Sequence, residues 1–142
     1  QDTDPVKFQK FVTEGAPCHY TFYVPHDVKG LIKVMGGKKA FEMRLDSLFD
    51  EHRYWHGNEP CHQIPFLYAY IGRTDKLQER VNHILATEYA DSPGGLSGND
   101  DAGQMSAWYI FASMGMYPVC PGTKAYVRFR PLFEEVKIGG GG

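Results

Sequence analysis

The sequence lacks the long apolar run that a membrane-spanning helix requires, since no stretch approaches the roughly 20 residues that cross a bilayer. It also lacks a strong charge of either sign, because 15 basic and 17 acidic side chains leave a net charge of −2. That balance gives no support for nucleic acid or an anionic membrane as the main partner. Residues 1–5 show no basic region followed by an apolar core, so no signal peptide is visible, although a mature or truncated chain would look the same.

Cysteine is scarce, and its spacing matches no structural zinc site. Cys18, Cys61 and Cys120 are odd in number and include no CxxC pair. We interpret them as thiols packed in the interior, where cysteine behaves as a small apolar residue. One disulfide is the alternative if the protein is exported. No internal repeat or low-complexity linker divides the chain, and its length and 42% hydrophobic content suit one globular domain.

Hydrophobic periodicity predicts a helical protein with a little β structure at its end. Asp27 is a suitable cap for the first helix, and Pro65 is a place for a kink in the third. The last helix is apolar nearly all round, so we expect it to be buried, with Trp108 in the core. Alternating residues at 126–129 and 136–138 predict short strands. The expected helices cover residues 28–35, 38–51, about 60–71, 75–89 and 104–114.

Three polar loops, at residues 13–15, 56–60 and 98–104, are rich in glycine, asparagine, histidine and carboxylates. Each precedes a helix, and such loops at the same end of successive helical hairpins are expected to converge on one pocket. Two separated carboxylates there suit hydrolysis of a glycosidic bond, one donating a proton and the other attacking the sugar or activating water. The alternative is that Glu59, Asp100 and the next aspartate only cap helix N-termini.

Four motifs, in order, resemble those of glycoside hydrolase family 92. Residues 20–32 (YTFYVPHDVKGLI) are similar to part of its WQYTWFVPHDVEGLI stretch, and residues 56–60 (HGNEP) match its HGNEP. Residues 94–109 (GGLSGNDDAGQMSAWY) are similar to its DGLSGNEDCGQMSAWY, and residues 117–122 match its YPVCPG. One such motif is weak evidence, but four in family order along nearly the whole chain are highly specific.

The resemblance implies a mainly α fold, part of an (α/α)6 toroid with short C-terminal β-strands. Residues 1–122 are then a partial catalytic domain, 123–138 strands that return toward a β-sandwich missing from this chain, and 139–142 a glycine tail. Without the sandwich and the first half of the toroid, the chain is expected to be a fragment, inactive without the remainder of the same parent enzyme.

The implied activity is hydrolysis of terminal α-linked mannose with inversion, with the α-1,2 linkage favoured and Ca2+ as cofactor. Mannose-containing oligosaccharides or glycoproteins are the implied partners, and the implied location is secreted, periplasmic or another exported compartment. Glu14 matches the family's general acid, and Asp101 matches its general base, which takes a proton from the attacking water. The neighbouring Asp100 is expected to cap the helix.

Binding residues follow from the same motifs. Asn58 and Glu59 match the segment that helps to hold calcium, and their oxygen atoms suit that ion. His56, Asn99 and Gln104 are expected to bind the substrate. Linkage specificity and oligomeric state stay open.

The family's EGNAWQY reads EGAPCHY here, so an asparagine and a tryptophan close to the expected acid are replaced. This change supports an alternative from another class: a glycan-binding or structural module that has lost catalysis. An unrelated helical interaction domain, with the acidic loops as ordinary caps, is a third interpretation, which the ordered motifs disfavour.

Overall fold

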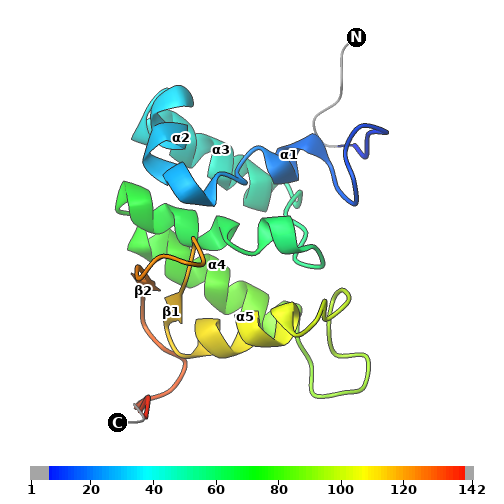
Figure 1. Ribbon diagram of the computed structural model, residues 1–142, viewed down its shortest axis with the longest axis vertical. Helices are drawn as coiled ribbons and strands as arrows, with labels where there is room; N and C mark the ends of the chain where they lie inside the picture. The colour runs from blue at the N-terminus through cyan, green and yellow to red at the C-terminus, as the bar shows by residue number, and fades with distance from the viewer. Residues whose placement is uncertain (1–6, 140–142) are drawn as a thin grey trace.

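The computed structural model describes residues 7–139 and consists mainly of short helices (Figure 1). The predictions for residues 1–5 and for the glycines from 140 onward lie outside these residues. Among residues 7–139, no helix is both long enough and apolar enough to cross a membrane. The elements are α1 (Pro17–Tyr20), α2 (Val28–Val34), α3 (Lys38–Asp50), α4 (Thr74–Thr87) and α5 (Gln104–Ser113), the 3-10 helices η1 (Pro25–Asp27), η2 (Glu59–Cys61) and η3 (Ile64–Ile71), and the strands β1 (Met116–Tyr117) and β2 (Val127–Arg128).

The helices are stacked along the long axis of the molecule in chain order (Figure 1). Helices α2 and α3 lie at one end, η3 and α4 in the middle, and α5 at the other end, and η3 packs against both α3 and α4. The buried stripes of α3 (Phe41, Leu45, Leu48) and α4 (Leu77, Val81, Ile84) recur every three or four residues. This spacing turns one face of each helix toward the shared core.

Local signals set the ends of α2 as predicted. The Asp27 carboxylate accepts a hydrogen bond from the backbone N–H of Gly30 at 2.8 Å, which satisfies one donor of the first turn. Gly36 and Gly37 follow the helix with φ of 96° and 93°, a backbone conformation that glycine adopts without steric cost. The predicted cap and stop of this helix are confirmed.

The expected helix over residues 60–71 is two 3-10 helices instead, η2 and η3. Pro60 and Pro65 each stand in the first turn of one of them. Proline lacks a backbone N–H and clashes with the preceding helical turn, so one continuous α-helix through Pro65 is disfavoured. Nearly every side chain of η3 is buried between its two helical neighbours.

The prediction that the last helix is wholly buried is wrong. In α5, Ile110 is 56% exposed and Tyr109 is 36% exposed. The reason is position: α5 lies at the end of the stack, where only one side faces other helices (Figure 1). Trp108, on the inner side, is fully buried as predicted and donates a hydrogen bond from Nε1 to the His62 carbonyl at 2.9 Å.

One of the two expected strands is present. Within 126–129, β2 forms and pairs antiparallel with β1, with Met116 opposite Arg128 and Tyr117 opposite Val127. The expected strand at 136–138 is wrong, since these residues have no strand assignment or ladder partner among the residues described. The predicted domain boundary at residue 122 falls between the two paired strands. The segment after it is tied to the helical body by this pairing, since β1 packs on α5, and by the Arg130 N–H, which donates to Gln78 Oε1 of α4 at 2.9 Å.

The cysteines form no disulfide within residues 7–139. Cys61 is fully buried, and burial raises the pKa of its thiol to about 12, so the thiol stays protonated. Cys18 and Cys120 are half-buried. The interior location that we predicted for the thiols therefore holds fully only for Cys61.

Candidate active site

The three polar loops meet, as predicted, at one hollow of about 440 Å³. In Figure 1 they lie together on the right of the view, beyond the helix ends and away from β1 and β2. Four of the expected site residues line this hollow: Glu14, Asn58, Asn99 and Asp101. The rest of its lining consists of Trp55, Gly57, Leu96, Ser97 and Gly98.

The second and third loops touch through their main chains. A Cβ atom added to Gly98 would lie 2.4 Å from the carbonyl oxygen of Gly57, and one added to Gly57 would lie 2.9 Å from that of Ser97. Carbon and oxygen cannot approach so closely without contact strain, so only glycine fits at this crossing. The contact fixes the separation between the segment that carries Asn58 and the segment that carries Asp101.

The backbones of both candidate catalytic residues are unusual. Glu14 has φ of 54° and Asp101 has φ of 50°, and Ala102 follows with 56°. Such left-handed conformations are uncommon outside glycine and cost about 1–3 kcal/mol each, so the surrounding structure must hold them. Among residues 7–139 only His52 joins these three as a non-glycine residue with positive φ. The conformational cost is therefore concentrated at the hollow.

Hydrogen bonds brace the first loop against the second. The Asn58 side-chain amide donates to the carbonyl oxygen of Glu14. The Ala16 N–H donates to His19 Nδ1 at 3.1 Å, so Nε2 carries the ring hydrogen and donates to the Arg53 carbonyl at 2.9 Å. His19 thus anchors the altered EGAPCHY segment.

Glu59 and Gln104 do not line this hollow. They border a smaller one of about 230 Å³, next to His62, Gln63 and Tyr117. Buried Gln63 has no hydrogen-bond partner for its Nε2 among the described residues. Asn58 and Glu59 are adjacent in the sequence but border different hollows. The reason is that η2 begins between them.

The expected sugar-binding role of His56 has no support in the geometry. Its side chain is 1% exposed, and its ring lies in edge contact with Trp108 at 4.4 Å between centroids. Burial lowers the pKa of His56 to about 3, with a further lowering by His62, so the ring is neutral at ordinary pH. Burial also lowers the pKa of His62, against the opposing effects of its hydrogen bond to His56 and of the Asp101 charge. His56 lies behind the hollow instead of facing it.

Asp100 satisfies a backbone donor in the first turn of α5, as a cap would, although the N-cap residue itself is Gly103. Its Oδ1 accepts hydrogen bonds from the Ser106 N–H at 3.0 Å and from the Ser106 hydroxyl at 2.8 Å. The adjacent Asp101 turns to the hollow. The two carboxylates of this motif therefore have different surroundings.

Trp55 is a lining residue that the sequence interpretation missed. Its indole is 38% exposed and lies beside His19, at 6.2 Å between ring centroids. An exposed aromatic face at a polar hollow suits stacking against a sugar ring. The available signal was its position immediately before the HGNEP motif.

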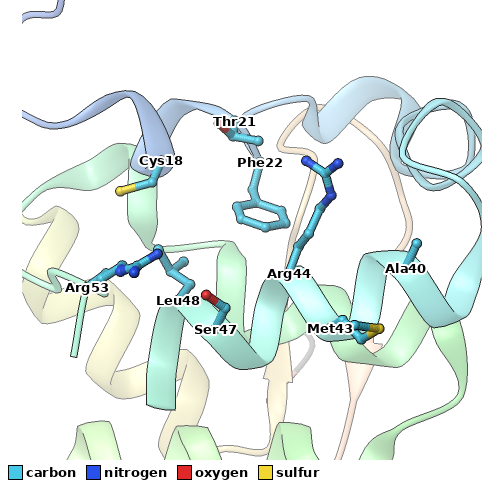
Figure 2. Close-up of a pocket in the computed structure, with 9 residues that line it drawn as sticks. All are labelled: Cys18, Thr21, Phe22, Ala40, Met43, Arg44, Ser47, Leu48 and Arg53. Carbon is cyan, nitrogen blue, oxygen red and sulfur yellow. The ribbon is translucent and has the colours of Figure 1, made fainter. Parts of the chain in front are cut away.

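A different hollow, of about 430 Å³, lies between α1 and α3 (Figure 2). Phe22 and Arg44 point into the same region, and Cys18 stands at its edge with its sulfur turned away from Phe22. No carboxylate is among its lining residues. It therefore offers no acid and base for glycoside chemistry.

Comparison with known proteins identifies the family and excludes an unrelated helical interaction domain. The profile of the glycosyl hydrolase family 92 catalytic domain matches residues 1–141. This chain belongs to glycosyl hydrolase family 92. Its helices are accordingly part of an (α/α)6 toroid with short C-terminal strands, as predicted.

Solved structures of family 92 enzymes and one curated glycosidase resemble the chain over most of its length. It is 44% identical to a family GH92 α-mannosidase from Bacteroides thetaiotaomicron, with a TM-score of 0.83 over 90% of this chain and 18% of that one. It is 34% identical to a family GH92 inverting mannosidase from Bacteroides thetaiotaomicron VPI-5482, with a TM-score of 0.82 over 92% of this chain and 21% of that one. An uncharacterized secreted glycosidase of Arthroderma benhamiae is 40% identical over 117 residues, which are 82% of this chain and 15% of that protein. The chain thus spans about a fifth or less of the length of these proteins.

Proposed function

We propose that this chain supplies the acid and base of a family 92 glycoside hydrolase that removes terminal α-linked mannose with inversion. The observation that supports this most strongly is the meeting of Glu14 and Asp101, from distant parts of the chain, at one hollow. Both are held in costly backbone conformations, which accumulate at functional sites. Relatives named as α-mannosidases and as an inverting mannosidase support the choice of sugar and of stereochemistry.

In this proposal protonated Glu14 donates its proton to the oxygen that leaves the sugar. Asp101 accepts a proton from a water molecule that attacks the anomeric carbon from the opposite face. An inverting pair of carboxyl groups stands roughly 6.5–9.5 Å apart, which leaves room for that water. Asn99, on the rim beside Asp101, orients the water or the carboxylate.

Calcium is part of the proposal, with Asn58, which lines the hollow, as its protein ligand; Glu59, the other expected ligand, borders the neighbouring hollow instead. Amide and carboxylate oxygens have the chemistry that Ca2+ prefers, but the ion takes six to eight ligands. Residues 7–139 contain no cluster of three histidine, cysteine or acidic side chains suited to a metal. Water, sugar hydroxyls and other parts of the parent enzyme must therefore complete the set. When bound, the ion would hold sugar hydroxyls and help to distort the ring.

Removal of calcium is expected to abolish mannose release by the complete protein, and added Ca2+ to restore it. Asn58→Ala is expected to raise the Ca2+ concentration needed for half-maximal activity about tenfold or more, because one oxygen ligand is lost. Asn82→Ala, on the exposed side of α4, is the matched control and should leave the titration unchanged. Full activity in excess chelator would contradict the calcium requirement.

The proposed substrates are mannose-containing oligosaccharides and glycoproteins, with the α-1,2 linkage favoured, met in an exported compartment. The curated relative described as secreted supports that location. The complete protein should release mannose from α-1,2-linked mannobiose, and proton NMR during the first turnovers should show the β-anomer. The 142-residue chain assayed alone should release none.

An inactive glycan-binding module is the second candidate, favoured by the EGAPCHY departure beside Glu14. Mannose binding by the calcium-loaded complete protein, without release from any mannobiose linkage, would favour it. Release of the α-anomer first would instead contradict inversion.

A further inference from the structure

A buried hydrogen-bonded group lies directly behind the hollow. His56 Nε2 lies 2.7 Å from the Tyr89 hydroxyl, and that hydroxyl lies 3.0 Å from the carbonyl oxygen of Met105. A carbonyl only accepts and a hydroxyl has one hydrogen, so Tyr89 donates to Met105 and accepts from His56. His56 therefore carries its hydrogen on Nε2, and its Nδ1 accepts from the Tyr54 hydroxyl at 2.8 Å.

Tyr89 connects three segments through this arrangement. Its hydroxyl bridges His56, two residues before Asn58, to the first turn of α5, which follows the loop of Asp101. Its own position pairs antiparallel with Leu96, which closes the 88–97 loop so that its end reaches the hollow. The Tyr89 side chain thus links the segment that carries Asn58 to the segment that carries Asp101.

A second connection between these two segments does not involve Tyr89. His62 Nε2 donates to the His56 carbonyl at 2.9 Å, and the His62 carbonyl accepts from Trp108 in α5 at 2.9 Å. The aromatic rings of Tyr89 and Trp108 also lie nearly parallel, with centroids 5.9 Å apart. Loss of the Tyr89 hydroxyl alone therefore leaves the fold supported.

We infer that Tyr89 is a positioning residue of this site, an inference that rests on the proposed mannosidase function. Its hydroxyl is not part of the lining of the hollow. It acts through His56 and the start of α5. Behind the Gly57–Gly98 contact, it sets how the segment of Asn58 is oriented relative to the segment of Asp101. Small misplacements of reacting groups reduce turnover steeply, while ground-state binding changes little.

The test compares Tyr89→Phe with Tyr54→Phe in the complete protein. Each change removes one hydroxyl hydrogen-bonded to His56 and keeps the ring, but only the Tyr89 hydroxyl also reaches α5. Tyr89→Phe is expected to lower kcat about tenfold to a hundredfold with KM changed less than about threefold. Tyr54→Phe should keep kcat within about twofold, and thermal unfolding should show both variants folded at the assay temperature.

Unchanged kcat in Tyr89→Phe, or equal losses in the two variants, would overturn the inference. Complete absence of mannosidase turnover in the wild-type protein would count against the proposed function instead. In that case hydrogen exchange of the backbone amides at 57–58 and 98–103 decides. Faster exchange in Tyr89→Phe than in Tyr54→Phe supports the positioning role, and equal exchange rejects it.

Discussion

Asp101→Asn in the complete protein should lower kcat for mannose release by about 10³-fold and change KM little. The amide has the shape of the carboxylate but cannot take a proton from water, and a general base contributes about 10²–10⁴-fold. Asparagine also tolerates the left-handed backbone at this position, where φ is 50°, so the loop should keep its path. Steady-state kinetics on α-1,2-linked mannobiose measure the effect.

Asp100→Asn is the matched control for this experiment. The two aspartates are adjacent, but Asp100 accepts hydrogen bonds from Ser106 at the start of α5. The amide oxygen of asparagine can accept both hydrogen bonds, so turnover should stay close to that of the wild-type protein. A larger loss in Asp100→Asn than in Asp101→Asn would exchange the two roles and refute the proposed base.

Gly98→Ala is expected to reduce both stability and turnover. The new methyl group would stand 2.4 Å from the Gly57 carbonyl oxygen, so the loops must separate or distort. Forcing extra atoms into a filled space costs about 1–3 kcal/mol. A displacement of about 1 Å between the catalytic groups is sufficient for a loss of about 10²-fold in kcat. Thermal unfolding and kinetics on the same preparation measure the two effects.

Gly94→Ala, four residues earlier in the same loop, is the control for Gly98→Ala. No atom lies within 4 Å of a Cβ added there, so stability and kcat should match those of the wild-type protein. Full turnover in Gly98→Ala would show that the main-chain contact does not set the geometry of the site.

Local signals made several elements predictable from the sequence. The cap at Asp27 depends on neighbours a few residues away, and the stripes of α3 and α4 follow the helical repeat. Burial was harder to predict, because it depends on which elements become neighbours. Pattern alone did not show that η3 occupies the middle of the stack and α5 its end. The strand expected at 136–138 failed for a related reason, since a strand needs a partner that its own residues do not specify.

For the candidate site too, some features could be predicted from the sequence and others could not. The convergence of three polar loops followed from their recurring place before helices, and the roles of Glu14 and Asp101 came from the family motifs. The sequence did not reveal that His56 turns inward to two tyrosine hydroxyls. It also did not separate Asn58 from Glu59, which are adjacent in the motif but border different hollows. Side-chain direction in a loop depends on long-range packing, for which motif spacing carries no information.

The contact between Gly57 and Gly98 also bears on how such an enzyme diversifies. Main-chain atoms fix the distance between these loops, so the side chains on the rim do not have to hold it. The Trp55 indole packs directly on Gly57, since a Cβ atom added there would lie 2.7 Å from its Nε1, whereas the Leu96 side chain borders the hollow and is not among the atoms nearest to either glycine. Variation at Leu96 is therefore expected to reshape the opening of the hollow while the Gly57–Gly98 contact keeps its place.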